Sequence, residues 1–207
     1  MKEVSSEGRG RRPTPWLTFA LGAAALLLWQ APASWLQFLE LSREGLDRGE
    51  WWRLYTSHLV HHTGEHLLFG VVHQVGFVFV GTFCELRSPE RTRWMLLLAA
   101  SAVGIGVLSF DGGIDTYRGL SGLATALFAF FLADAWRRTS RFGPYRAAVS
   151  VLGCLLGAKL LAETLGGNSI FIGETVGFVS VPAAHWCGAL IGLVRGAFGA
   201  RSSAVLA

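Results

Sequence analysis

The sequence predicts an all-α polytopic membrane protein, a bundle of six transmembrane helices with both termini in the cytoplasm. Only 15% of its 207 residues are charged and 52% are apolar, whereas soluble proteins average about 25% charged residues. Glycine, which is more frequent in transmembrane helices than in soluble ones, accounts for 26 residues. This composition excludes a disordered chain and argues against an ordinary soluble enzyme, because too few charged side chains remain to cover a globule of this size.

Six apolar stretches mark the expected spans. They cover residues 16–30, 66–83, 94–110, 120–136, 145–161 and 176–198. Most approach the 17–25 residues that a helix needs to cross a hydrocarbon core of about 30 Å. The first stretch follows a basic segment and precedes Ala31-Pro32-Ala33, as a signal peptide would. Because proline directly follows the small residue and five further stretches come after, we interpret it as a retained helix.

Lysine and arginine are distributed unevenly between the two sides of the predicted bundle. If the N-terminus is cytoplasmic, the inside segments contain Lys2, Arg9, Arg11, Arg12, Arg87, Arg91, Arg93, Arg137, Arg138, Arg141, Arg146, Arg195 and Arg201, and the outside segments contain Arg43, Arg48, Arg53 and Arg118. Thirteen basic residues against four agree with the positive-inside rule. The predicted organisation is a basic cytoplasmic N-terminus (1–15), a membrane domain (16–198) and a cytoplasmic tail (199–207).

The longest connection is an outer loop over residues 31–65. Aromatic side chains are frequent in it, and they are Trp35, Phe38, Trp51, Trp52 and Tyr55. Such rings are favoured at the boundary between membrane and water. We therefore expect this loop to lie on the outer membrane surface.

Several polar side chains fall inside or beside the apolar stretches, where an ionisable group is costly and usually functional. Ser121 lies about one turn into the fourth stretch, His185 roughly nine residues into the sixth, and His66 begins the second. These three stretches all run from outside to inside in the predicted topology. We therefore expect the three side chains to meet in the outer half of the membrane.

A serine and a histidine that meet can act as nucleophile and general base. Ser121 lies within Gly119-Leu120-Ser121-Gly122, whose glycines allow close backbone approach and an N–H group facing an oxyanion. Gly188, Gly192 and Gly196 follow His185 as a ridge of small residues, against which a neighbouring helix can pack closely. Taken singly, a helix-packing serine and a structural histidine are the alternatives.

Together these motifs resemble those of the rhomboid family of intramembrane serine proteases. The resemblance extends from about Trp51 to Gly196. Its pieces are Trp52-Arg53, His61-x4-His66-Leu-Leu-Phe, Gly119-Leu120-Ser121-Gly122 and Ala184-His185-x2-Gly188-x3-Gly192. It implies a six-helix rhomboid-like bundle that cleaves membrane-anchored proteins near the outer face of the bacterial inner membrane.

The resemblance also implies the role of each motif residue. Ser121 is the nucleophile and His185 its general base. The oxyanion is held by the N–H groups of Ser121 and Leu120 and by the His66 side chain, and Trp52-Arg53 stabilises the outer loop. No acidic third member and no cofactor are implied, and the partners are the lipid bilayer and transmembrane substrates rather than nucleic acid.

Two positions depart from the family pattern. Gly70 stands where rhomboids usually have an asparagine that donates to the oxyanion, and the loss of such a donor typically costs about 2.7–4 kcal/mol in catalysis. Thr125 stands where many rhomboids have a tyrosine that packs on the base, so we expect another ring, such as Trp186, to support His185. These departures favour the alternative of an inactive rhomboid-like chaperone or binding protein. A small transporter is a third alternative, against which the lack of an inverted repeat counts.

Within the family, the short chain, Tyr117-Arg118-Gly-Leu-Ser-Gly and Lys159-x3-Glu163 are similar to the rhombosortase branch. That resemblance implies substrates with a C-terminal Gly-Gly motif, a membrane span and a basic tail. Lys159 and Glu163 are spaced for an i,i+4 ion pair near the outer membrane edge. Substrate recognition is the alternative role for this pair.

For the remaining histidines and the cysteines we expect structural rather than catalytic roles. His58, His61 and His62 are interpreted as loop or interface residues, and no metal site is predicted, because HExxH is absent and Gly64 makes a continuous helix through 58–66 doubtful. The three cysteines, at 84, 154 and 187, are far apart and lie in or beside apolar stretches. We expect them to be small buried hydrophobic residues.

Overall fold

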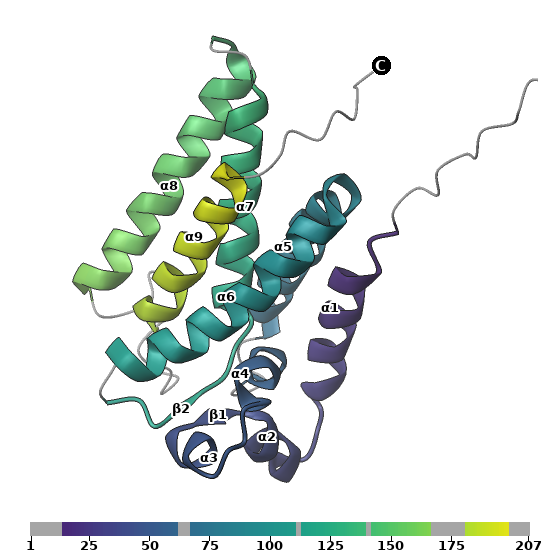
Figure 1. Ribbon diagram of the computed structural model, residues 1–207, viewed down its shortest axis with the longest axis vertical. Helices are drawn as coiled ribbons and strands as arrows, with labels where there is room; N and C mark the ends of the chain where they lie inside the picture. Colours follow the sequence, from purple (N-terminus) through teal and green to yellow (C-terminus); the bar gives the residue numbers. More distant parts are fainter. Residues whose placement is uncertain (1–13, 62–66, 111–112, 140–141, 167–180, 199–207) are drawn as a thin grey trace, which may run out of the picture.

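The computed structural model describes residues 14–61, 67–110, 113–139, 142–166 and 181–198, with the side chains of the second segment described from Gln74 onward. Six long helices account for most of these residues (Figure 1). They are α1 (Trp16–Leu28), α5 (Leu67–Arg87), α6 (Pro89–Phe110), α7 (Ser121–Arg138), α8 (Pro144–Gly166) and α9 (Pro182–Ala197). Each helix overlaps one of the six apolar stretches.

The helix ends differ from the predicted ones mainly where charged residues flank the apolar core. α5 continues to Arg87, α6 begins at Pro89 and α7 continues to Arg138. The expectation that Ser121 lies one turn inside its helix is wrong, because Ser121 is the first residue of α7. α8 continues past the apolar run to Gly166, and so includes Glu163.

α7 is the central helix, since it packs against α5, α6, α8 and α9. A core cluster joins α5, α6 and α7 and includes Phe77, Met95, Leu127 and Phe130. The first helix is fixed to α5 by a polar contact. The buried Glu85 carboxylate accepts hydrogen bonds of 3.0 Å from the N–H groups of Leu17 and Thr18, in the first turn of α1.

The connection before α5 forms short elements gathered at one end of the bundle (Figure 1). They are α2 (Ala33–Leu39), β1 (Leu41–Ser42), α3 (Arg43–Asp47), α4 (Arg53–Thr56) and the 3₁₀ turn η1 (Ser57–Leu59). β1 pairs antiparallel with β2 (Thr116–Tyr117), Leu41 opposite Tyr117. This two-stranded pair is absent from the all-helical prediction, and it holds the segment before α7 against the loop.

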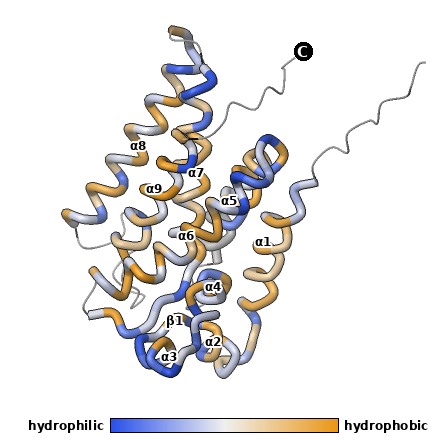
Figure 2. Tube along the Cα trace, viewed as in Figure 1, coloured by the Kyte–Doolittle hydropathy of each residue, from blue (hydrophilic) through white to orange (hydrophobic). Residues whose placement is uncertain are grey.

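Hydrophobic residues are frequent along the long helices (Figure 2). Leu27, Phe79, Leu155 and Leu165 are all exposed, and in α8 the buried residues are Val149, Leu160 and Glu163. Among the described residues, α6 and α8 are long and apolar enough to cross a membrane, and α1 is a shorter apolar helix. An apolar exterior of this kind is typical of a surface that contacts lipid or another protein.

Two sets of side chains test the predicted exposure, the aromatic residues of the loop and the cysteines. The five aromatic side chains expected on the outer surface, at 35, 38, 51, 52 and 55, are all exposed. Cys84 is buried and Cys187 is half-buried, but Cys154 is exposed. The prediction for Cys154 is wrong because it lies on the outward face of α8.

Candidate active site

The segment that leads into α7 places Ser121 at the helix N-terminus. Gly119 adopts a φ of +136°, which favours glycine, and turns the chain into the helix. Its N–H donates to the Ser57 carbonyl at 3.0 Å, and the Tyr117 hydroxyl donates to its carbonyl at 3.1 Å. The Gly-Leu-Ser-Gly segment is therefore held by η1 and β2.

His58 is part of this support. It lies in η1, within the predicted loop, but it is fully buried, which corrects the interface alternative of its interpretation as a loop or interface residue. Its Nδ1 lies 3.2 Å from the Gly119 carbonyl and its Nε2 lies 3.1 Å from the Ala100 carbonyl. Its ring also packs edge-on against Tyr117. Burial lowers the pKa of His58, although the neighbouring carbonyls oppose the shift.

Glycines bring α7 and α9 into backbone contact. A methyl group on Gly188 would overlap the Gly122 carbonyl oxygen, and one on Gly192 would overlap the Ala126 carbonyl oxygen. A methyl group on Gly122 would lie 3.2 Å from the Ala184 carbonyl oxygen. Ser121 and His185 each directly neighbour this contact in the sequence, so the structure brings them to the same end of the α7–α9 pair.

His185 is buried, and its ring is held by α8. Its Nδ1 lies 2.7 Å from Glu163 Oε2. The other Glu163 oxygen accepts a hydrogen bond of 2.9 Å from Lys159 Nζ, which lies 3.4 Å from His185 Nδ1. The ion pair of Lys159 and Glu163 is thus present, and it includes the histidine. We did not predict the contact between Glu163 and His185, and it corrects the expectation that no acidic group accompanies the imidazole.

The Ser121 hydroxyl forms no hydrogen bond with His185 in the described residues, and its side chain lies beside the Tyr117 hydroxyl. Burial raises the pKa of that hydroxyl, and Ser121 partly opposes the shift. Catalytic hydrogen bonds are often long without substrate and shorten when it binds. The N–H groups of Leu120 and Ser121 donate to no described residue. They lie at the helix start, where backbone donors point outward.

Comparison with known proteins identifies the family. Residues 48–202 match the model of the Rhomboid domain. The chain belongs to the rhomboid family. It is similar to a Bacillus subtilis (strain 168) protein described as "Putative rhomboid protease YdcA", with 29% identity over 155 residues, which are 74% of this chain and 72% of the relative. Membership of the family and the apolar helices make this rhomboid a membrane protein.

In this rhomboid the Trp-Arg motif lies in the connection between α1 and α5. Arg53 is buried, and its Nη1 donates to the carbonyls of Gln37 and Glu40 at 2.7 Å each. Its guanidinium also pairs with Glu50 and lies over the Phe38 ring. Trp52 is exposed and packs on Phe38 at 5.7 Å between centroids. Arg53 therefore ties α2 to α4.

The residues that replace the family pattern lie as follows. Thr125 is buried, and its hydroxyl donates to the Ser121 carbonyl at 2.9 Å, within α7. Trp186 is partly exposed, and its Nε1 donates to Thr164 Oγ1 at 2.9 Å. The expectation that Trp186 supports His185 is not met by these contacts, since the indole fixes α8 rather than the imidazole. His62 and His66, and the side chains at 70 and 73, lie outside the described residues.

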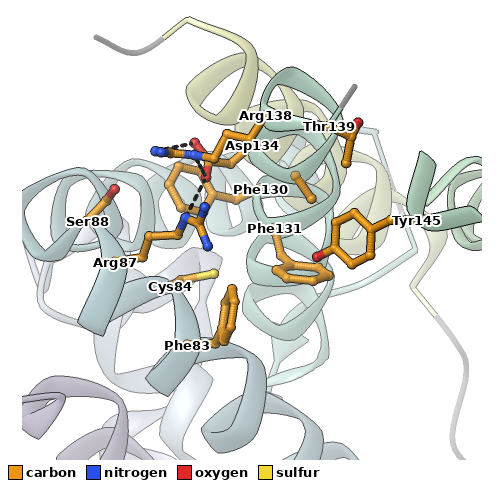
Figure 3. A pocket seen from close by; sticks show the side chains of 11 residues that line it. Phe83, Cys84, Arg87, Ser88, Phe130, Phe131, Asp134, Arg138, Thr139 and Tyr145 are labelled. Carbon is orange, nitrogen blue, oxygen red and sulfur yellow. Dashed lines mark hydrogen bonds and ion pairs between the residues drawn. The ribbon is translucent and has the colours of Figure 1, made fainter. Parts of the chain in front are cut away.

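The other end of the bundle gathers arginines around one carboxylate. Asp134 lies 2.8 Å from Arg91 and 2.7 Å from Arg138, and Arg87 is 3.8 Å away. A cavity of about 320 Å³ adjoins these groups (Figure 3). Asp134 follows Ser121 by thirteen residues of α7, about 20 Å along the helix. This cavity is therefore remote from Ser121 and His185.

Proposed function

We propose that this rhomboid is an intramembrane serine endopeptidase in which Ser121 is the nucleophile and His185 the general base. The observation that carries the proposal is the close packing of α7 on α9, which brings the first turns of both helices together at Gly122 and Ala184. On this proposal, a rearrangement of the two side chains brings the Ser121 hydroxyl to the imidazole.

In this mechanism the Ser121 oxygen attacks the carbonyl carbon of the scissile peptide while His185 Nε2 removes the hydroxyl proton. The same proton then passes to the leaving amine, and water hydrolyses the acyl-enzyme. The N–H groups of Leu120 and Ser121, which donate to no described residue, are suited to hold the oxyanion. His66, which lies outside the described residues, is the proposed side-chain donor.

The proposed topology has six spans, cytoplasmic termini and the active site near the outer face of the bacterial inner membrane. The arginines around Asp134 support it, because they lie at the end of α7 opposite Ser121. Basic residues are retained on the cytoplasmic side. The outer loop, with its exposed aromatic rings, lies at the Ser121 end and suits the opposite surface.

Substrates on this proposal are membrane-anchored proteins whose spans are weakened near the cleavage site, because a hydrogen-bonded helix hides its carbonyls from Ser121. From the similarity to rhombosortases we further propose substrates with a C-terminal Gly-Gly motif, a hydrophobic span and a basic tail. Two substrates, with and without Gly-Gly, distinguish this subtype from a general rhomboid.

The test is cleavage of such a substrate by the purified protein in liposomes, combined with labelling by a serine-directed fluorophosphonate. Wild-type protein should cleave and be labelled, whereas Ser121→Ala should do neither and His185→Ala should lose both to a large extent. Cleavage at the wild-type rate by Ser121→Ala would overturn the proposal.

The second candidate is an inactive rhomboid-like binding protein. The absence of a Ser121–His185 hydrogen bond among the described contacts and the threonine at position 125 favour it. Folded wild-type protein that binds a transmembrane partner, resists the fluorophosphonate and cleaves no substrate would support this candidate.

A further inference from the structure

The ion pair on α8 contacts the proposed general base directly. Glu163 is only 2% exposed. One of its oxygens is 2.7 Å from His185 Nδ1, and the other is 2.9 Å from Lys159 Nζ. Resting on the proposed function, we infer that Glu163 is the acidic third member of the active site, a positioning residue that acts through His185.

The carboxylate selects the tautomer of the imidazole. An ionised carboxylate can only accept hydrogen bonds, so the short contact requires a proton on His185 Nδ1. Nε2 then keeps its lone pair, which is what a base for the Ser121 hydroxyl needs. A histidine with the proton on Nε2 would present a donor to the serine and could not take its proton.

Lys159 would favour the other tautomer if it donated to the imidazole, but its main contact is with the Glu163 carboxylate, which it orients. An ammonium that donated to Nδ1 would favour the wrong tautomer, yet its separation from Nδ1 is 3.4 Å, against 2.7 Å for the carboxylate. Lys159 instead holds the second Glu163 oxygen and balances its charge. The carboxylate can therefore remain ionised in a site from which water is largely excluded.

The charged side chains that face His185 determine how the pH–rate profile should respond to substitutions. From α8, Glu163 and Lys159 face the ring. Of the other helices packed on α9, α6 and α7 carry their charged residues at their far ends, from Glu90 to Arg93 and from Asp134 to Arg138. Among the described residues, one negative and one positive side chain thus act on the imidazole in opposite senses.

The first experiment measures kcat, KM and the pH–rate profile of Glu163→Gln and Lys159→Met. In Glu163→Gln, Lys159 retains the amide oxygen and the amide NH₂ faces Nδ1. This reverses the tautomer, so kcat should fall by about 10³–10⁴-fold with little change in KM. The acid limb of the profile should move to lower pH in Glu163→Gln, because a charge that favours the protonated ring is lost. It should move to higher pH in Lys159→Met. Glu90→Gln, an exposed carboxylate at the far end of α6, is the control and should match wild type.

A purely structural ion pair is tested by the double variant Lys159→Met/Glu163→Leu. Apolar replacement of a buried pair often leaves stability unchanged, so a structural role predicts a folded and active protein. The inference predicts a folded protein whose kcat remains at least about 10²-fold low. Full kcat in the double variant, or identical acid limbs in both single variants, would overturn it. Failure of the proposed function is a different result, in which wild-type Ser121 is neither labelled nor active.

Discussion

The contact between α7 and α9 can be tested by adding one methyl group. Gly188 lies three residues after His185, and its Cα faces the backbone of Gly122. In Gly188→Ala the new methyl would overlap the Gly122 carbonyl oxygen and lie 3.1 Å from the carbonyl carbon. Neither atom belongs to a flexible side chain, so the two helices must separate by about 1 Å to recover ordinary van der Waals contact.

The cost follows from this displacement. Overpacking of a rigid contact costs about 1–3 kcal/mol, and the helix propensity of alanine over glycine returns up to about 1 kcal/mol. With the full return, the net loss is up to about 2 kcal/mol, which corresponds to a decrease of up to about 8 °C in the melting temperature of a chain of this size. Displacement of His185 from Ser121 by about 1 Å should lower kcat/KM by about 10²-fold. Thermal unfolding in detergent and cleavage of a transmembrane substrate measure the two effects.

Two matched variants separate packing from catalysis. A methyl group on Gly157, in α8, meets nothing within 4 Å, so Gly157→Ala should be neutral or slightly stabilising. A methyl group on Gly196 would lie 2.6 Å from Ala133 Cβ and 2.7 Å from the Phe130 carbonyl oxygen, three turns from His185. Gly196→Ala should therefore lower stability and affect activity less. Wild-type stability and activity in Gly188→Ala would refute the close-packing argument.

Three further predictions concern buried polar side chains outside the dyad. Arg53→Met should lower the free energy of unfolding by about 1–3 kcal/mol, because it leaves two backbone carbonyls without their donor and removes one of the two arginines that pair with Glu50, as denaturation in detergent would show. Glu85→Gln should cost about 1–3 kcal/mol, because the amide presents one acceptor where two N–H groups of α1 need two; equal melting temperatures would contradict this. Burial lowers the pKa of His58 from 6.5, so the unfolded chain binds a proton that the folded chain does not. Its contribution to stability is complete above pH 6.5 and is lost as the pH falls below it. The melting temperature of His58→Gln should therefore decrease less between pH 8 and pH 5 than that of wild type.

The positions of the helices could be predicted because an apolar run of this length rarely forms anything other than a helix. Each of the six stretches overlaps a helix, and the glycine ridge on α9 packs against α7 as its spacing predicts. The short elements could not be predicted in the same way. β1 and β2 have two residues each, too few to show an alternating pattern, and they pair across more than seventy residues of chain. The burial of His58 depends on the same tertiary contacts, since its partners are the backbone carbonyls of Ala100 and Gly119.

The contact between Glu163 and His185 could not be predicted from the sequence, because Lys159 already offers the Glu163 carboxylate a partner within the same helix. A buried carboxylate needs partners, and Lys159 at i,i+4 supplies one within a single helix. Sequence spacing predicts that pairing but does not give the rotation of α8 about its axis, and so it does not predict what else the carboxylate contacts. A carboxylate nevertheless has two oxygens, and one ammonium hydrogen bond satisfies only one of them. Helices that adjoin in the chain and run in opposite directions place the end of one beside the start of the next. The second oxygen therefore needs a hydrogen-bond donor near the start of α9, where the His185 imidazole can supply one.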